Sequence, residues 1–311
     1  MSSDLIRIVD EVRQRGLDHD ILQRITVIEG VAINETPIRV GKGRGELGEV
    51  DIPILRDPSG IPYIPGSSLK GSMRSFIEAL ARGSGLRVCT PFNSSLCAFG
   101  AEFLNYVLQT ALTATTVDSL LERVKDERRL GEIARRRIES HEVAEKVVKS
   151  IIEKVNDVES LIAVLRDYAP CVACRIFGNP ALASRITVFD AYPADPTAVK
   201  TVVRTRVAID RLREAARSGA LFEYEFVPRG FEWRIRIEIK NIDLSSDQEE
   251  SRLLRMLLKH FSDMGIVVGG MKSVGHGVLK LDPERSRVKI YRVRDLSLHL
   301  ETDTTLREFL R

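Results

Sequence analysis

The sequence predicts an α+β domain of the ferredoxin-like type, built on an antiparallel sheet. Three observations support this prediction. Strand-like and helix-like hydrophobic patterns follow one another in the order strand, helix, strands, helix, strand. Residues 231–240 alternate strictly between apolar and charged side chains. The length of 311 residues is sufficient for a sizeable core that carries insertions.

The first part of the chain contains one helix pattern and one strand pattern. Residues 1–22 read as an N-terminal helical extension, because Leu and Ile/Val side chains recur on one helical stripe. Residues 23–34, QRITVIEGVAIN, are rich in β-branched side chains and predict a strand, which ends at a glycine-spaced loop over 40–48. A helix over 67–82 follows.

A long charged stretch then interrupts the core pattern. Between residues 101 and 170, Leu, Ile and Val recur at helical spacings among many Arg and Glu residues, which predicts a helical insertion. We therefore expect the core to consist of residues 23–100 and 171–284. Residues 285–311 are expected to form a C-terminal tail.

The clearest strand is residues 231–240, FEWRIRIEIK, with one buried face and one wet face. Residues 221–227, LFEYEFV, precede it across Pro228-Arg229-Gly230, a short turn that predicts an antiparallel hairpin between the two segments. A helix over 248–261 and a short strand over 277–281 complete the core pattern.

The helix predicted after Pro65 begins in a way that suits a phosphate ligand. Ser67 and Ser68 stand at its start, and Lys70 and Arg74 share one helical face. Unpaired amides and the helix dipole favour anions at such a start. The alternative is an ordinary helix entry whose two cations are only a solvated face.

A glycine-rich loop, GIVVGGMKSVGHG, covers residues 265–277 and holds five of the 21 glycines. Glycine allows backbone to approach a ligand closely, so the loop could wrap a sugar–phosphate chain. A tight structural turn is the alternative interpretation. The candidate contact residues are Gly269, Gly270, Lys272, Ser273 and His276.

Together these motifs resemble those of the RAMP superfamily of CRISPR-associated proteins. The resemblance lies in GEVDIPILRDPSGIPYIPGSSLKGSMRS at 48–75, CRIFG at 174–178, AIDR at 208–211, VPRG at 227–230 and GGMKSVGHG at 269–277. Within that superfamily, the motifs are most similar to the Csm3-like (Cas7 group) backbone subunits of type III effector complexes.

The resemblance implies a ferredoxin-like, RRM-like RAMP/Cas7 core with a hairpin thumb, which we place near residues 192–230. It implies a subunit that binds crRNA, forms a filament with copies of itself and works with other type III Cas subunits. It further implies that the subunit cleaves bound target RNA at regular intervals in a metal-dependent reaction.

In the family motif the catalytic aspartate precedes a Pro, a hydrophobic pair and a basic-Asp dipeptide, which assigns that role to Asp51. Metal-dependent RNA cleavage needs the 2′-hydroxyl deprotonated and the phosphate charge neutralised. One carboxylate is too few for a protein-built two-metal site, so we expect Mg²⁺ or another divalent cation to be held largely by RNA and water. A turn-capping role is the alternative for Asp51, and it is our interpretation of Asp57.

Two places depart from the family pattern. The glycine cluster after the first strand is Gly41-Lys42-Gly43-Arg44-Gly45, in which Lys42 and Arg44 are expected to contact RNA phosphates. The last loop has Val274 where an arginine is usual, and Lys272 could supply the missing charge.

All four cysteines flank the predicted insertion: Cys89, Cys97, Cys171 and Cys174. If the insertion is a helical hairpin its two ends meet, and four thiolates could converge on a structural Zn²⁺. Cysteine is also a common small buried hydrophobe, which is the alternative interpretation.

A net charge of +3 excludes nucleic-acid binding by bulk charge, so any such binding must use a local cationic surface. No apolar run of about 18 residues is present, and we expect a cytoplasmic protein without a membrane partner. Two other functions stay open. They are a non-catalytic RAMP subunit that binds or caps crRNA, and a Cas6-like crRNA-processing endoribonuclease that would act through histidine without metal.

Overall fold

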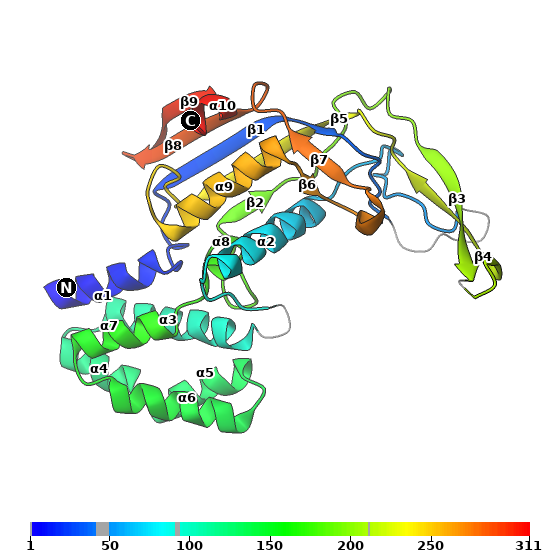
Figure 1. Ribbon diagram of the computed structural model, residues 1–311. Coiled ribbons are helices and arrows are strands. Elements are labelled where there is room, and N and C mark those ends of the chain that lie inside the picture. Colours follow the sequence, from blue (N-terminus) through cyan, green and yellow to red (C-terminus); the bar gives the residue numbers. More distant parts are fainter. Residues whose placement is uncertain (1, 42–49, 91–93, 211) are drawn as a thin grey trace.

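The computed structural model describes residues 2–41, 50–90, 94–210 and 212–311, and it confirms the predicted fold class (Figure 1). An antiparallel sheet has the order β2-β5-β1-β7-β6. If β1, β2, β5 and β7 are counted as the four core strands, this is the ferredoxin-like order, with each crossover made by a helix. The predicted order of strands and helices along the chain therefore agrees with the topology of the sheet.

The centre of the sheet is the pair β1 (Arg24–Asn34) and β5 (Glu232–Lys240), which are antiparallel over nearly their whole length. The alternation in β5 works as expected, since Trp233 and the three isoleucines are buried and the charged side chains between them face solvent. The short strand β2 (Ile186–Val188) adds to the other edge of β5.

Two helices cover one face of this sheet. They are α2 (Gly66–Gly83) and α9 (Glu249–Asp263), which contact each other and lie side by side in Figure 1. Their apolar stripes, which include Leu69, Met73, Leu254 and Phe261, form one core with the inner face of the sheet. The short strands β6 (Ile266–Val267) and β7 (Val278–Leu281) follow α9.

Residues 285–311, expected to form a tail, contribute strands to the sheet. β8 (Arg287–Arg294) pairs with β1 over Arg24–Glu29, next to the part of β1 that pairs with β7. β9 (Ser297–Thr305) pairs with β8, and α10 (Leu306–Phe309) follows. The apolar residues Val288, Ile290 and Leu306 are buried in the main core.

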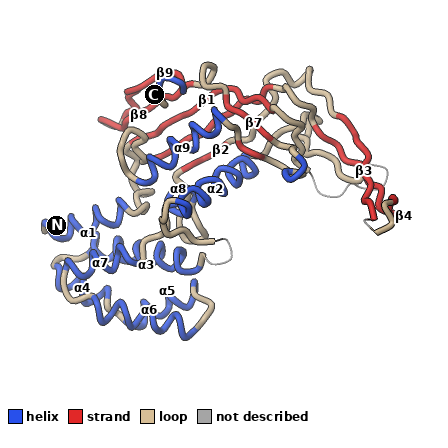
Figure 2. Tube along the Cα trace, in the orientation of Figure 1, coloured by secondary structure: helices blue, strands red, loops and turns tan. Residues whose placement is uncertain are grey.

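The helices in the region expected to be an insertion lie together, apart from the strands (Figure 2). They form their own hydrophobic core, to which the N-terminal helix α1 (Ser3–Gln14) contributes Leu5, Ile8 and Val12. None of the described helices is both long and apolar enough to cross a membrane. The helices of the region expected to be an insertion are α3 (Ser95–Thr113), α4 (Val117–Val124), α5 (Glu127–Arg137), α6 (His141–Lys154) and α7 (Val158–Asp167). The helix α8 (Val172–Phe177) leads back to the sheet.

The chain between β2 and β5 forms a long hairpin, which projects away from the sheet (Figure 1). It consists of β3 (Val202–Asp210) and β4 (Ala215–Phe226). The predicted hairpin between residues 221–227 and 231–240 is wrong, because β4 pairs with β3 instead. Both edges of β5 are occupied, one by β1 and one by β2, so β5 has no edge left for the segment that precedes it.

Candidate nucleic-acid interface and cysteine cluster

Asp51 lies at the root of the hairpin, on a segment that is bonded to β4. The amide of the next residue, Ile52, donates to the carbonyl of Glu223, and its carbonyl accepts from the amide of Glu225, both at 3.1 Å. The Asp51 carboxylate extends this ladder, since its Oδ2 accepts from the Glu223 amide at 2.7 Å. Among the described residues Oδ1 has no hydrogen-bond partner, and the side chain is exposed.

An ion pair between Arg56 and Glu225 holds the same segment to β4. Glu225 also accepts from the amide of Ile54 (3.1 Å), and Arg56 donates to the hydroxyl of Thr201 (3.0 Å). Burial by itself would raise the pKa of Glu225, but hydrogen bonds from Thr201, from the Ile54 amide and from Arg56 outweigh it and lower that pKa. The charged form of Glu225 therefore fixes the position of the Asp51 segment.

Among the described residues, the surroundings of Asp51 supply no metal site made of protein groups alone. In the part of the chain that the structure describes, the groups of three or more ligand residues that could hold a metal ion do not include Asp51. A lone exposed carboxylate fits a cation held mainly by RNA and water. Asp57 accepts from the amides of Ser59 and Ile61, both at 2.9 Å, which confirms it as a turn cap.

A carboxylate of the protein itself lies at the start of α2. The amide of Gly66 donates to Oδ1 of Asp190 at 2.7 Å, so a carboxylate already occupies the predicted phosphate position at that amide. Ser67 is exposed and Ser68 is half-buried. Lys70 is half-buried and donates to the hydroxyl of Ser184 at 2.8 Å, which leaves two of its three N–H donors for a ligand.

Arg74, predicted to contact RNA phosphate, has several protein partners. Its guanidinium pairs with the buried Glu78 (2.8 Å), donates to the carbonyl of Gly178 (2.9 Å) and lies 3.7 Å from Sγ of Cys174. Side-chain exposure is 27%, and these partners use the face turned toward the core. Lys70 and Arg74 therefore have different surroundings although both lie on α2.

In the glycine-rich loop, Gly269 fits the interpretation as a tight structural turn, whereas Lys272 and Ser273 fit the interpretation as ligand contacts. Gly269 has φ +87°, and a Cβ there would lie 2.1 Å from the carbonyl oxygen of Arg39, so this glycine permits close packing. Lys272 and Ser273 are exposed on the short helix η1 (Lys272–Val274). The expected contacts Lys42 and Arg44 lie outside the described residues.

His276 is buried, with 5% exposure, and packs against two rings of β4. Its ring centroid lies 5.9 Å from that of Tyr224 and 5.7 Å from that of Phe226. Burial lowers the pKa of His276, and Arg206, Arg204 and Arg39 lower it further. Acid–base cleavage through this histidine would need an exposed imidazole, so the burial disfavours the Cas6-like alternative.

Sequence reasoning missed two of those arginines. Arg204 and Arg206 are two residues apart on β3, so both side chains lie on one face of the hairpin. The signal was present in the sequence as VVRTRV, an alternating strand pattern with cations on one face.

The four cysteines converge where the helical core meets the sheet core. Their sulfur atoms all lie within 4.8 Å of one another, with Cys89 to Cys174 at 3.4 Å and Cys89 to Cys171 at 3.6 Å. A tetrahedral zinc–thiolate site has sulfur–sulfur separations of about 3.8 Å. The group could therefore hold a metal ion. All four are free thiols, and three of them are buried.

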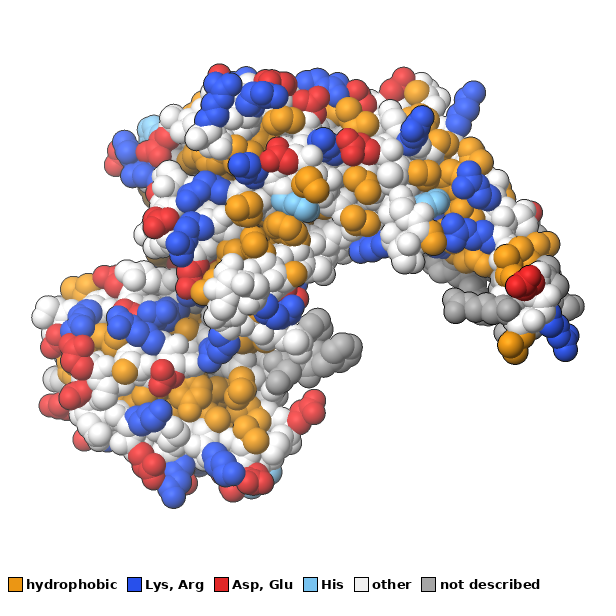
Figure 3. All heavy atoms as spheres, in the orientation of Figure 1, with side chains coloured by type: hydrophobic (Ala, Val, Ile, Leu, Met, Phe, Trp, Pro, Cys, Tyr) orange, Lys and Arg blue, Asp and Glu red, His pale blue; other side chains and the backbone are white. Residues whose placement is uncertain are grey.

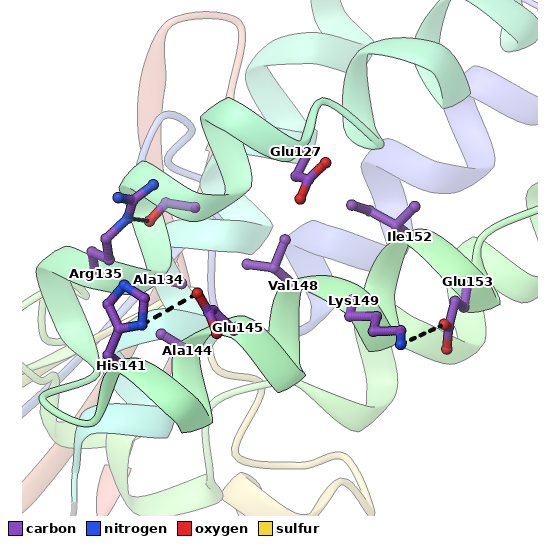
Figure 4. A pocket seen from close by; sticks show the side chains of 11 residues that line it. Glu127, Ala134, Arg135, His141, Ala144, Glu145, Val148, Lys149, Ile152 and Glu153 are labelled. Atoms are coloured by element: carbon purple, nitrogen blue, oxygen red, sulfur yellow. Dashed lines mark hydrogen bonds and ion pairs between the residues drawn. The ribbon is translucent and has the colours of Figure 1, made fainter.

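A groove with a cavity volume of about 500 Å³ lies between α5 and α6 (Figure 4). Val148 and Ile152 contribute to its apolar lining. Charged and polar residues line it too, and two pairs of them contact each other, His141 with Glu145 (3.2 Å) and Lys149 with Glu153 (3.8 Å). None of the predicted site residues in the described part of the chain lines this groove, and we assign it no function.

Comparison with known proteins agrees with the geometry. The sequence profile of the RAMP superfamily matches residues 34–280, which is most of the chain. Two curated relatives are each named "CRISPR system Cms endoribonuclease Csm3". The protein from Methanothermobacter thermautotrophicus is 44% identical over 59 residues, 18% of this chain and 24% of the relative. The protein from Mycobacterium tuberculosis is 41% identical over 60 residues, 19% of this chain and 23% of the relative.

These matches span only about a quarter of the length of either relative. The superfamily match, in contrast, runs from the end of β1 to β7 and so includes Asp51, the hairpin and the glycine-rich loop. The ferredoxin-like strand order of the sheet is consistent with that match. The chain belongs to the RAMP superfamily.

Proposed function

We propose that this chain is a crRNA-binding backbone subunit of a type III CRISPR effector complex, and that it cleaves bound target RNA at regular intervals with Asp51. The observation that carries the proposal is the way in which the Asp51 carboxylate is held. One carboxylate oxygen is anchored to the Glu223 amide at the hairpin root, while the other is exposed and has no partner among the described residues. The relatives named as endoribonucleases add support.

For this cleavage we propose attack by the RNA's own 2′-hydroxyl. The 2′-hydroxyl next to the scissile phosphate loses its proton and attacks phosphorus, and the bond to the 5′-oxygen breaks as that oxygen takes up a proton. The products are a 2′,3′-cyclic phosphate and a 5′-hydroxyl. A divalent cation, when bound with RNA, supplies charge neutralisation at the phosphate. The free oxygen of Asp51 would accept the proton directly or through a water molecule.

Guide binding would use exposed and half-buried polar residues near the two other motifs. Ser67, Ser68 and Lys70 lie at the start of α2, and the glycine-rich loop contributes Lys272 and Ser273. The partners that we propose are crRNA, target RNA, further copies of this chain in a filament and other type III Cas subunits. Such binding should weaken as salt concentration rises.

The test is target cleavage by the reconstituted complex. Guide RNA, matched target RNA and Mg²⁺ are supplied to complexes that carry wild type, Asp51→Ala or the control Asp247→Ala, an aspartate whose side chain is 90% exposed near α9. We expect regular cleavage with wild type and the control, and none with Asp51→Ala. Regular cleavage by the Asp51→Ala complex would refute the assignment and leave the non-catalytic subunit as the function.

We also propose that Cys89, Cys97, Cys171 and Cys174 hold a structural Zn²⁺. The convergence of four sulfur atoms to within 4.8 Å supports this, because thiolates at tetrahedral spacing are the ligands of closed zinc sites. The ion would join the loop after α2, the start of α3 and the start of α8. Metal analysis of the purified protein tests it.

A further inference from the structure

The guanidinium of Arg74 faces the cysteine cluster, which comprises Cys89, Cys97, Cys171 and Cys174. Its Nη2 donates to Sγ of Cys174 at 3.7 Å, a hydrogen-bond distance for sulfur. Cys174 is fully buried, and its sulfur lies 3.4 Å from that of Cys89. One N–H of Arg74 is therefore directed at a sulfur atom of the group that we propose holds Zn²⁺.

Two other contacts hold the guanidinium in this position. Nε pairs with the buried carboxylate of Glu78 at 2.8 Å, and Nη1 donates to the carbonyl of Gly178 at 2.9 Å. Gly178 directly follows α8, the helix that carries Cys174. Because the guanidinium is a rigid fork, the first two contacts fix the direction of the third N–H, which meets the sulfur.

The charges around the cluster suit a metal ion bound by thiolates. Four thiolates and Zn²⁺ together carry two negative charges, which are costly where water is excluded unless cations lie nearby. Arg74 and Arg82 both pair with Glu78, at 2.8 Å and 3.5 Å, so these three side chains add one net positive charge beside the cluster. Neutral thiols are weak acceptors and would give Arg74 no charged partner on this side.

Two enclosed arginines elsewhere in the chain face carboxylates instead of sulfur. Arg185 pairs with Asp18, and Arg175 pairs with Glu250. On the visible surface of the helical unit (α1 and α3–α7), cations and carboxylates are interspersed, as expected where water screens charge (Figure 3). Arg74 differs from both groups, because it is half-buried and one of its donors meets a sulfur atom.

A backbone amide makes a second contact of this kind. The amide of Cys171 donates to Sγ of Cys97 at 3.4 Å, and both residues are buried. Donors behind metal ligands orient the ligands and tune the metal, and their removal typically weakens metal binding. The amide belongs to the backbone, whereas Arg74 is a side chain that can be replaced, so Arg74 offers the test of such a donor.

We propose that Arg74 is a positioning residue of the metal site. It donates to the Cys174 thiolate, orients that thiolate toward the ion and stabilises the negative charge of the metal–thiolate group, without binding the ion itself. The inference rests on the proposed Zn²⁺ site and gives the arginine of SLKGSMR, residues 68–74, a role other than RNA contact. The alternative is a purely structural role, in which Arg74 only ties α2 to the carbonyl of Gly178.

The first test measures the zinc affinity of the full chain by competition with a chromophoric chelator. Arg74→Gln is compared with the charge-matched control Arg82→Gln. Arg82 lies on the same helix and also pairs with Glu78, but it donates to the carbonyl of Cys89 and not to sulfur. We expect zinc affinity to fall by about tenfold or more in Arg74→Gln and by less than about threefold in the control. Zinc affinity equal to that of wild type in Arg74→Gln would overturn the proposal.

Unfolding with and without zinc separates a structural role from a role at the metal. If Arg74 only ties α2 to Gly178, Arg74→Gln loses the same stability in the metal-free and the zinc-bound forms, and that result would refute the inference. If Arg74 acts on the Cys174 thiolate, the loss is larger in the zinc-bound form, because weaker binding to the folded state stabilises it less.

Cobalt(II) is the spectroscopic probe of the same contact. Thiolates bound to Co²⁺ give a sulfur-to-metal charge-transfer band, and a donated hydrogen bond stabilises the sulfur electrons, so loss of the donor should move the band to longer wavelength. Arg74→Lys keeps the charge but lacks the fork, so its band should lie between those of wild type and Arg74→Gln. Should Arg74→Gln fail to fold, Arg74→Lys carries the test, and a band at the wild-type wavelength would count against the contact.

Failure of this inference can be told apart from failure of the proposed function. Wild type that binds neither zinc nor cobalt refutes the metal site and the role of Arg74 together. Wild type that binds zinc with an affinity that Arg74→Gln matches refutes only the role of Arg74. Both results leave the assignment of Asp51 to its own assay, which is target cleavage by the reconstituted complex.

Discussion

The carboxylate of Asp51 and the backbone amide of Glu223 are 2.7 Å apart, so a hydrogen bond joins the proposed catalytic residue to β4 of the hairpin. The two residues are separated by most of the chain, yet Ile52 continues the same ladder with β4. Any RNA that reaches Asp51 therefore lies next to the hairpin root. This contact gives the site its position, and Arg56 and Glu225 keep it there.

Asp51→Asn separates the charge of Asp51 from its anchoring contact. The amide oxygen of asparagine can still accept from the Glu223 amide, but the side chain has no negative charge and cannot accept the proton. We expect target cleavage to fall by about 100-fold or more, because general-base catalysis typically contributes that much. The free energy of unfolding should change by less than about 0.5 kcal/mol. Full activity in this variant would contradict a role for the charge.

Glu225→Gln tests the ion pair that holds the Asp51 segment. The pKa of Glu225 is lowered in the folded state, so its charge contributes stability above its ordinary pKa of 4.5, and that stability is lost as pH falls through the folded value. At pH 7 we expect urea unfolding to show a loss of about 1–2 kcal/mol. The difference from wild type should shrink as pH falls below about 4.5.

The matched control for that measurement is Glu142→Gln, since Glu142 is 76% exposed and pairs with Lys146 on the surface of α6. Exposed pairs contribute little, so the control should change the free energy of unfolding by less than about 0.5 kcal/mol at pH 7. An equal effect of the two variants would show that the Arg56–Glu225 contact is no stronger than a surface pair.

The cysteine cluster predicts one zinc ion per chain, measurable by elemental analysis after purification without added chelator. Cys174→Ser should lose the ion and lower the thermal midpoint by about 5 °C or more, because metal binding to the folded state adds directly to its stability. A strong chelator should destabilise wild type and have no effect on Cys174→Ser. Zinc-free wild type of unchanged stability would support the alternative of buried, unligated thiols.

Arg74→Ala and Lys70→Ala should have opposite consequences although both residues lie on α2. Arg74 pairs with the buried Glu78 and the Gly178 carbonyl, so its loss should reduce the free energy of unfolding by about 2–3 kcal/mol and leave RNA affinity nearly unchanged. Lys70→Ala should weaken RNA binding with a smaller cost in stability. The reverse result, with Arg74→Ala folded normally but deficient in RNA binding, would restore Arg74 as a phosphate contact.

The local patterns of the sequence predicted the core elements correctly. Strict alternation over residues 231–240 predicted the two faces of β5, and the β-branched run at 23–34 predicted β1. These predictions succeed because the side-chain period of a strand or helix is a local property. The pairing of residues 221–227 failed because the choice of partner depends on which strand edges are free, which no local pattern records.

The sequence by itself therefore determined the periodicity of the elements, the fold class and, through its motifs, the candidate Asp51. Only the tertiary structure decided which groups meet. It turned Arg74 toward the carbonyl of Gly178, joined β8 to β1, brought four cysteine sulfurs to within 4.8 Å, and enclosed His276 with Tyr224 and Arg39. The physical reason is that contacts between residues distant in the chain depend on how the hydrophobic faces pack together, and that packing belongs to the whole fold.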